Sequence, residues 1–219
     1  MTEENNNVKA ASLDGLDKKT TKERIFDVAI DLFAQKGFDA VSLREISDAV
    51  GIKKPTLYYY FTSKDEILEK ILEYPMKRVE KIGWHDTETE ELIVSLGLEK
   101  FMSKACDICI SWMDDPYMEK IFRIILVELY HNQQIKNFYT MFIDVSGSFW
   151  ELIFTLMIKN KLIKLSDPKI LASEYLSFYG NAFLQYFLLQ YGNTPGSFRQ
   201  EYQDVIDKHT AFTVNAIKP

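Results

Sequence analysis

The sequence has few cysteines and no long uninterrupted run of apolar residues. Its 2 cysteines, Cys106 and Cys109, are too few for a disulfide-stapled secreted scaffold. Charged residues such as Arg123 and Lys159 interrupt the most apolar stretches, so none reaches the roughly 18 residues of a membrane-spanning helix. The polar start of the chain lacks the apolar segment and cleavage site of a signal peptide. These absences predict a soluble cytoplasmic protein without membrane contact, with a disordered tail over residues 1–17.

The sequence also lacks an excess of positive charge. Its 26 Lys and Arg residues against 32 Asp and Glu give a formal net charge of −6, which excludes a protein that coats nucleic acid with its whole surface. The balance is uneven, because residues 18–82 hold 13 basic and 11 acidic residues, whereas residues 83–219 hold 12 and 17 and residues 1–17 hold 1 and 4. A contact with nucleic acid is therefore expected only on one face of residues 18–82.

Sequence motifs of catalysis, phosphate binding and metal binding are absent as well. The 9 glycines form no G-x-G pair, no G-K-[ST] occurs, and the 3 histidines stand without a nucleophile or carboxylate at motif spacing. A single C-x-x-C without a second cysteine pair or a histidine cluster does not make a zinc site. We therefore predict a protein that is not an enzyme and uses no cofactor or metal. A catalytic site assembled from residues far apart in sequence is the open alternative.

A helical pattern runs through the whole sequence. Hydrophobic residues make up 47% of the chain and aromatic residues 14%, enough for a substantial core. They recur at spacings of three and four rather than two, which predicts an all-α fold. The predicted helices span residues 20–36, 43–50, 54–61, 64–82, 87–114, 116–132, 134–162, 168–191 and 198–216. The composition changes after Gly83, which divides a small N-terminal bundle from a larger helical body.

Three S/T-x-x-E patterns mark helix starts in the N-terminal bundle. In such a capping box the hydroxyl accepts a hydrogen bond from the backbone N–H three residues on, and the carboxylate returns to the backbone of the capping residue. The pairs are Thr20 with Glu23, Ser42 with Glu45, and Ser63 with Glu66. Pro75 lies inside the fourth predicted helix, where its missing N–H predicts a kink or a split.

Residues 43–62 have the pattern of a helix-turn-helix motif. A helix of eight residues ends at Gly51, which tolerates the positive φ of a tight turn, and Pro55 opens a second short helix. Leu57 and Phe61, four residues apart, predict the inward face of this second helix. Its lysine, threonine and tyrosine side chains are left on the outer face, where they can meet phosphates and thymine methyl groups. The second helix is therefore predicted to enter the major groove of DNA.

The motif is part of a longer stretch with a family signature, ERIFDVAIDLFAQKGFDAVSLREISDAVGIKKPTLYYYFTSKDEILEKIL. Four segments within it have the spacing found in one protein family: Phe-x-x-x-Gly-Phe, Ser-Leu-Arg-Glu-Ile, Gly-Ile and Thr-Leu-Tyr-x-Tyr-Phe-x-x-Lys. Residues 20–70 thus resemble the DNA-binding domain of the TetR/AcrR family of bacterial transcriptional repressors. The resemblance implies that residues 18–66 form a three-helix helix-turn-helix DNA-binding domain. It further implies that residues 67–219 form a larger helical ligand-binding and dimerisation domain.

The resemblance also implies which side chains meet DNA. They are the hydroxyl, basic, proline and tyrosine residues at the starts of the second, third and fourth helices and on the recognition helix: Ser42, Arg44, Lys53, Lys54, Pro55, Thr56, Tyr58, Tyr59, Tyr60 and Lys64. Packing of Tyr60 against the first helix is an equal alternative, and elsewhere Lys53 and Lys54 would be ordinary solvated lysines. Family members often begin this helix with a small or hydroxylated residue, so the base preference of Lys53-Lys54-Pro55 does not follow from the resemblance.

The C-terminal residues suit a dimer interface. Residues 175–189 are apolar almost all round, which predicts a helix buried on more than one side, and residues 198–214 add a second apolar helix. In the resembled family two such helices from each subunit form a four-helix interface, so we expect a homodimer through the last two helices. The alternative is the core of a monomer. Reading a palindrome requires two recognition helices about 34 Å apart, which favours the dimer.

Aromatic residues are concentrated between residues 112 and 187, and a helical body lined in this way can enclose a drug-sized apolar ligand. The expectation of an effector pocket comes mainly from the resemblance, and core packing is the alternative for each single residue. The candidate ligand-binding residues are Trp112, Phe122, Arg123, Glu128, Phe149, Trp150, Phe154, Tyr179 and Phe183. Among them Arg123 and Glu128 are candidates to orient a ligand, although pairing between helices explains such residues equally well.

Cys106 and Cys109 lie three residues apart within a predicted helix. Inert packing of two buried or half-buried thiols is the expected role, and a redox switch is the open alternative.

Together the sequence predicts a ligand-responsive, homodimeric transcriptional regulator, a repressor that leaves its palindromic double-stranded operator when a small apolar or aromatic effector binds. The effector acts through its different affinities for two states of the protein, with the helix around Pro75 as the predicted transmitter. The alternatives are a helical ligand-carrier or protein-interaction module and a redox-sensing regulator that uses Cys106 and Cys109.

Overall fold

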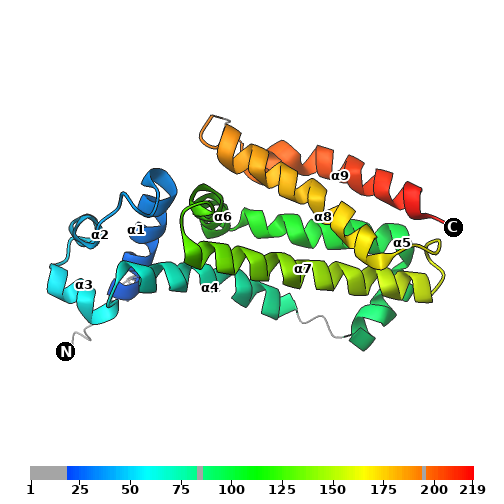
Figure 1. Ribbon diagram of the computed structural model, residues 1–219, viewed down its shortest axis with the longest axis horizontal. Helices are drawn as coiled ribbons and strands as arrows, with labels where there is room; N and C mark the ends of the chain where they lie inside the picture. The colour runs from blue at the N-terminus through cyan, green and yellow to red at the C-terminus, as the bar shows by residue number, and fades with distance from the viewer. Residues whose placement is uncertain (1–18, 83–85, 194–195) are drawn as a thin grey trace, which may run out of the picture.

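A computed structural model describes residues 19–82, 86–193 and 196–219, and every element in these ranges is helical (Figure 1). The all-α prediction is confirmed, while the predicted tail over residues 1–17 lies outside the described residues. The elements are α1 (Thr21–Lys36), α2 (Leu43–Val50), α3 (Lys54–Tyr60), α4 (Lys64–Ile82), α5 (Asp86–Ser111), η1 (Trp112–Asp114), α6 (Pro116–Glu128), α7 (Gln133–Lys159), α8 (Pro168–Leu184), η2 (Gln185–Gln190) and α9 (Phe198–Ile217).

The helices α1 to α3 form a small bundle at one end of the molecule, and α4 leads from it along the helical body (Figure 1). The apolar face of α1 carries Ile25 and Phe33 into a core that also holds Leu57 and Phe61. The same core includes Ile121 from α6, so the N-terminal bundle and the body share one continuous hydrophobic cluster. Burial of this shared surface joins the two parts, because apolar contact is the main favourable contribution to packing.

The body is built from α5 to α9, in which α7 packs along α8 and α5 along α9. Trp150, Phe154 and Tyr175 fill one of its cores, and Phe122, Phe187 and Phe198 are in the other. The helix α7 is long and apolar enough to span a membrane by length and composition alone, but this is weak support for a membrane protein. Its residues Trp150 and Phe154 are buried in the body instead.

Two irregular backbone segments differ from the predicted helices. Gly97 interrupts α5 with φ 71° and ψ 173°, where residues 87–114 are predicted as one helix. Such a backbone conformation is accessible mainly to glycine, which is the physical reason for the break. The predicted helix 168–191 ends as the π-helical segment η2 (Gln185–Gln190), an uncommon geometry that sequence periodicity does not encode.

Only the first predicted capping box is reciprocal. Thr20 accepts a hydrogen bond from the N–H of Glu23, and the Glu23 carboxylate accepts one from the N–H of Thr20. The hydroxyls at the other two starts do cap their helices, but the carboxylates bind elsewhere: Glu45 pairs with Lys36 and Glu66 accepts from Thr62.

Pro75 is buried within α4, which continues on both sides of it from Lys64 to Ile82. The proline therefore does not split the helix.

Candidate nucleic-acid interface

The turn between α2 and α3 has the geometry that a helix-turn-helix requires. Gly51 adopts the left-handed conformation with φ 76° and ψ 36°, which costs least for a residue without Cβ. Its N–H donates to the carbonyl of Asp48, and the N–H of Ile52 donates to the carbonyl of Ser47 at 3.0 Å. These bonds close the end of α2 and fix the direction in which α3 leaves it.

The helix α2 is held at its start and leaves one basic side chain in solvent. Ser42 caps it by accepting from the N–H of Glu45 at 3.1 Å. The Arg44 guanidinium is exposed and pairs with Asp48, one turn on, at 3.7 Å. Because an exposed pair of this kind contributes little stability, Arg44 is available to a DNA phosphate or groove edge at small cost.

The recognition helix α3 separates a buried face from an exposed one. Leu57 is 0% exposed and Phe61 is also buried, which confirms the inward face predicted from their spacing. Tyr59 is 84% exposed. Tyr60 is half-buried against the bundle core and meets the Tyr59 ring edge-on, with 5.1 Å between ring centroids. The other exposed members of the predicted DNA-contact set on this helix are Lys53, Lys54, Pro55, Thr56 and Tyr58.

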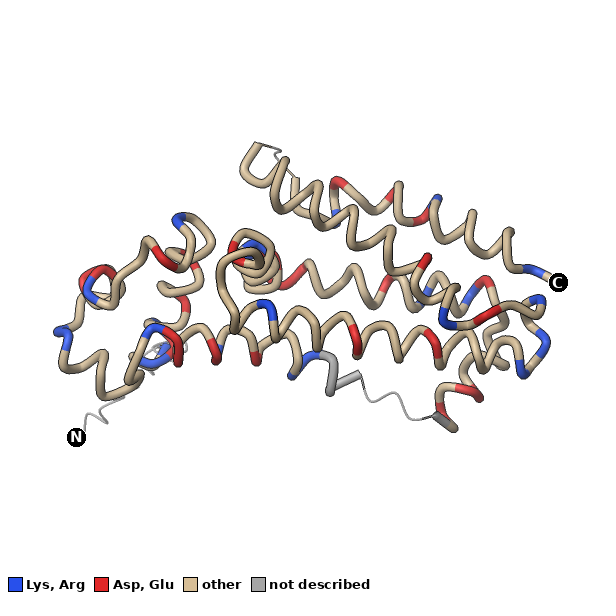
Figure 2. Tube along the Cα trace, in the orientation of Figure 1, with Lys and Arg blue, Asp and Glu red and all other residues tan. Residues whose placement is uncertain are grey.

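The start of α3 therefore places basic side chains at the outer end of the bundle (Figure 2). The Lys54 ammonium lies 5.6 Å from the centroid of the Tyr58 ring, one turn further along. This surface offers cations, a hydroxyl and aromatic edges on one short helix, which is the set of groups that contacts phosphates and base edges.

Lys64, a predicted phosphate contact, has partners within the protein. Its ammonium donates to the carbonyls of Phe38 at 2.7 Å and Val41 at 2.9 Å, and it stands 4.2 Å from the centroid of the Phe38 ring. In this structure Lys64 therefore anchors the connection between α1 and α2 to the start of α4.

A positioning residue that the motif analysis did not single out is Arg24. Its guanidinium donates to the carbonyl of Val50, at the end of α2, and so ties α1 to the turn of the motif. A long-range bond to a backbone carbonyl leaves no sequence pattern by which to find it.

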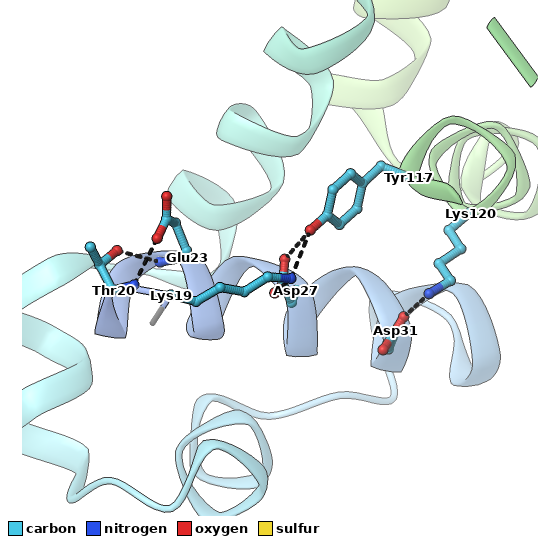
Figure 3. Close-up of polar contacts among 7 residues, drawn as sticks. All are labelled: Lys19, Thr20, Glu23, Asp27, Asp31, Tyr117 and Lys120. Atoms are coloured by element: carbon cyan, nitrogen blue, oxygen red, sulfur yellow. Dashed lines mark hydrogen bonds and ion pairs between the residues drawn. The ribbon is translucent and has the colours of Figure 1, made fainter. Parts of the chain in front are cut away.

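The helix α6 is fastened along α1 by polar contacts (Figure 3). The hydroxyl of Tyr117 donates to Asp27 at 2.5 Å, and Asp27 also pairs with Lys19 at 2.7 Å. One turn further along, Lys120 pairs with Asp31 at 2.5 Å. The body thus contacts the first helix of the N-terminal bundle through α6.

Glu128 lies where α6 meets the connection between α1 and α2, and it does not line the hollow between α7 and α8 that is described below. Its side-chain oxygen Oε1 accepts a hydrogen bond from the buried N–H of Phe38 at 2.8 Å. A Cβ atom on the neighbouring Gly37, whose φ is +84°, would lie 2.8 Å from the same oxygen. A ligand-orienting role for Glu128 stays a prediction, and in this structure its carboxylate bonds to the connection between α1 and α2.

Arg123, the other charged ligand candidate, joins α6 to η2, the segment that follows α8. Its guanidinium donates to the carbonyl of Phe187 and lies 5.2 Å from the centroid of the Tyr191 ring. Its Nε atom is buried without a hydrogen-bond partner within the described residues. Arg123 therefore acts as a link between helices in this structure.

A hollow of about 560 Å³ lies between α7 and α8, a size that suits a small molecule. Of the nine predicted ligand-binding residues, Phe122, Tyr179 and Phe183 line it. The other groups that shape it include two further aromatic residues, four serines and three charged residues: Tyr139, Phe142, Ser146, Ser148, Ser173, Ser177, Asp144, Glu151 and Lys169. The hollow thus has an aromatic end and a polar end.

The remaining aromatic candidates do not line this hollow. Trp150 and Phe154 are buried in the core, where the Trp150 and Tyr175 rings are 4.4 Å apart. Phe149 packs half-buried against the same core, and Trp112 packs against a second cluster. Their positions fit core packing, the alternative role considered for each of these residues.

The two cysteines have little nucleophilic character. Cys106 is buried, and its thiol contacts the hydroxyls of Tyr179 at 3.3 Å and Thr210 at 3.5 Å. Burial raises the pKa of the Cys106 thiol above its ordinary value and that of Cys109 to about 12. Both sulfurs are therefore protonated near neutral pH, which argues against a fast redox switch because the thiolate is the reactive form.

Exposed apolar side chains gather on the last helices. They lie on α8, η2 and α9 and include Ile170, Leu184, Leu188, Leu189, Val205 and Phe212. Phe212 is 71% exposed, which is unusual for a phenylalanine.

The fold and this site define a class, a helix-turn-helix domain joined to a helical body. Comparison with known proteins shows what the N-terminal domain resembles. The family described as "Bacterial regulatory proteins, tetR family" matches residues 25–71. The biofilm operon icaADBC HTH-type negative transcriptional regulator IcaR of Staphylococcus epidermidis is 48% identical over 52 residues, which are 24% of this chain and 28% of that protein. The chain therefore matches about a quarter of the length of this curated relative.

Solved structures extend the likeness to the whole fold. A TetR transcription regulator from Haloarcula marismortui has a TM-score of 0.66 at 12% identity, over 91% of this chain and 98% of that one. A putative transcriptional regulator from Saccharomonospora viridis in complex with choline has a TM-score of 0.60 at 17% identity, over 89% and 95%. The tetR family model therefore matches the N-terminal domain of this chain, and the overall fold is shared with solved structures of transcriptional regulators. These relatives and neighbours are described as transcriptional regulators.

Proposed function

We propose that this protein is a cytoplasmic transcriptional regulator that binds double-stranded DNA through α3. The observation that carries the proposal is the division of α3, in which Leu57 is buried while Lys54, Thr56 and Tyr59 stand in solvent. A short helix with this outer face, placed after a helix-turn-helix turn, suits the major groove. The IcaR relative is described as a negative transcriptional regulator, which supports a repressor.

The regulator acts as a homodimer through α8 and α9. The exposed apolar face that includes Leu189 and Phe212 is costly in water and is removed from it when two copies pair. A two-fold dimer also supplies the second recognition helix needed for a palindromic operator, at a separation of about 34 Å.

A small apolar or aromatic effector binds in the hollow between α7 and α8. Phe122, Tyr179 and Phe183 offer aromatic surface there, and the serines offer hydrogen-bonding groups. The choline complex of a neighbour with the same fold supports use of the fold for small molecules.

The helix α6 transmits the effector's presence to the DNA-binding bundle. Phe122 lines the hollow, and the next residue, Arg123, donates to the carbonyl of Phe187 in η2, the segment that follows α8. At the other side of the same helix, Tyr117 and Glu128 bond to α1 and to the connection that follows it. An effector that favours one position of α6 would thereby favour one position of the recognition helix.

The experiment is a titration of fluorescent DNA from the region upstream of the protein's own coding sequence, followed by anisotropy at low and high salt. We expect the unaltered protein to bind this DNA specifically. Thr56→Ala and Lys54→Gln should change the base preference, because these side chains stand at the start of α3. Lys208→Gln, on α9 and in an exposed pair with Asp204, is the matched control. Failure to retain any DNA at low salt would overturn the proposal and favour a ligand-carrier or protein-interaction module.

A further inference from the structure

A second hollow, of about 460 Å³, lies between α1 and α4 and is also lined by Tyr117 from α6. It is separate from the hollow between α7 and α8, since the two have no lining residue in common. Its volume falls within the range of small-molecule sites, roughly 300–1,000 Å³.

The floor of this junction hollow is aromatic. Phe26, Tyr74 and Tyr117 form a cluster with ring centroids 5.5 to 6.4 Å apart, and Phe61 adds a fourth ring. Both tyrosine hydroxyls are already engaged, because Tyr74 donates to Asp115 at 2.7 Å and Tyr117 donates to Asp27 at 2.5 Å. The floor therefore offers ring surface rather than free hydroxyl groups.

The rim of the junction hollow carries four lysines, Lys19, Lys22, Lys70 and Lys77, and two carboxylates, Glu23 and Asp27. Lys19 pairs with Asp27, and Lys70 and Lys77 both pair with Glu73, which leaves Lys22 as the lysine that can meet a ligand. Their helical spacing puts the lysines beside the rings, since Lys22 is one turn before Phe26 and Lys70 and Lys77 flank Tyr74.

The two acidic residues of the lining already have partners. Glu23 accepts from the N–H of Thr20 at 2.7 Å, and Asp27 is bonded to Lys19 and Tyr117 (Figure 3). By contrast, Lys22 pairs with no carboxylate in the described part of the chain and stands 5.6 Å from the centroid of the Phe61 ring. The hollow thus has positive charge available at the edge of an aromatic surface.

We propose that the junction hollow is a binding site for a planar aromatic monoanion, whose ring lies on the aromatic floor and whose carboxylate meets Lys22. Stacking on the rings uses the surface that is otherwise half-exposed, and the ammonium supplies the charge complement. A neutral aromatic gains the contact with the rings but not the contact with the Lys22 ammonium, and a cationic aromatic is repelled by that ammonium. Since the site is built from α1, α4 and α6, an occupant holds the DNA-binding bundle against the body.

The probe is 2-naphthoate, titrated into the full-length protein by calorimetry, with 2-naphthamide as the neutral analogue of the same shape. We expect naphthoate to bind and to raise the melting temperature, because a ligand of the folded state stabilises it. Lys22→Gln should weaken binding about threefold to fivefold, the effect of an exposed ion pair, and added salt should weaken it as well. Phe26→Leu, which keeps the apolar contact to the core, should weaken it further by removing a ring face.

Two control variants locate the site. Lys208→Gln removes an exposed lysine on α9 and should leave naphthoate affinity unchanged. Ser177→Phe fills the hollow between α7 and α8 and should also leave it unchanged. Three outcomes would overturn the proposal: no binding at millimolar naphthoate, equal binding of naphthamide, or binding lost in Ser177→Phe but kept in Lys22→Gln. If Lys22→Gln instead lowers only the affinity for DNA, Lys22 is a phosphate contact and the ligand site is refuted. If the unaltered protein fails to bind DNA, the proposed function fails, but the naphthoate result still stands.

Discussion

The Oε1 atom of Glu128, the last residue of α6, accepts a hydrogen bond at 2.8 Å from the buried backbone N–H of Phe38. The end of a helix is an unfavourable place for a carboxylate, because the last carbonyls already carry partial negative charge. The amide of Phe38 offsets part of that cost and gains a partner that it would otherwise lack. The bond spans 90 residues of sequence and joins the body to the connection between α1 and α2.

Glu128→Ala should lower the free energy of unfolding by about 1–3 kcal/mol, since the buried N–H of Phe38 loses its acceptor. Glu128→Gln keeps a side-chain oxygen at the same place and should lose less. Urea unfolding of the three proteins measures the difference. Equal stability of the alanine variant and the unaltered protein would show that water or another group replaces the carboxylate.

Gly37→Ala should be destabilising at the same junction. The residue has a φ of +84°, and the new Cβ would stand 2.8 Å from the Glu128 oxygen, so both backbone strain and the close contact oppose it. We expect a loss of about 1–3 kcal/mol in unfolding free energy.

Gly147→Ala is the matched control for this substitution. Gly147 lies within α7, has no positive φ, and has nothing within 4 Å of an added Cβ, so alanine there should raise the unfolding free energy by about 0.5–1 kcal/mol. Effects of the same sign at both glycines would contradict the account of Gly37.

The recognition motif was predictable from sequence because its signals are local. Gly51, Pro55 and the spacing of Leu57 and Phe61 each act within one turn of their own position, and the structure has the cap, the helix start and the buried face there. The predicted ends of α6, α7 and α9 lie within a few residues of the observed ones for the same reason.

The partners of charged side chains were not predictable in this way. Glu128 and Arg123 stand among apolar residues, a pattern shared by ligand contacts and by links between helices, and only the approach of distant segments decides between them. Likewise, the carboxylate of Glu45 reaches Lys36 on the preceding helix instead of closing its own capping box. Gly97 carried no turn signal in its neighbours, so the break in α5 appears only in the backbone angles.

Lys64→Met should lower the unfolding free energy by about 1–3 kcal/mol, because two carbonyls, those of Phe38 and Val41, lose a charged donor. Lys54→Met is the comparison, since Lys54 is exposed and should change stability little. Salt titration of DNA binding then tests the phosphate contact predicted for Lys64: each lost phosphate contact should reduce the slope of log affinity against log salt by about 0.9. Unchanged stability in Lys64→Met would contradict the anchoring role.

Phe212→Asp should convert the proposed homodimer into monomers, because it places a charge in the centre of the exposed apolar face of α9. Sedimentation velocity measures the oligomeric state, and affinity for a palindromic DNA should fall with it. Leu165→Asp is the control, since Leu165 is 88% exposed but lies between α7 and α8 rather than on α9. A dimer that survives Phe212→Asp and dissociates with Leu165→Asp would place the interface elsewhere.

The half-buried Cys109 predicts a loss of stability at alkaline pH. Burial raises its pKa in the folded protein from the ordinary value of 9.0 to about 12, so between these values the folded state holds a proton that the unfolded state has released. The stabilisation is therefore complete below about pH 9 and is lost as the pH rises toward 12. Unfolding by urea at pH 7, 9 and 10.5 should show a steeper decline for the unaltered protein than for Cys109→Ala, which lacks the thiol. Tyrosines ionise in the same range in both proteins, so the difference between the two curves isolates the effect of the Cys109 thiol. Parallel curves would contradict the claim that burial disfavours its thiolate.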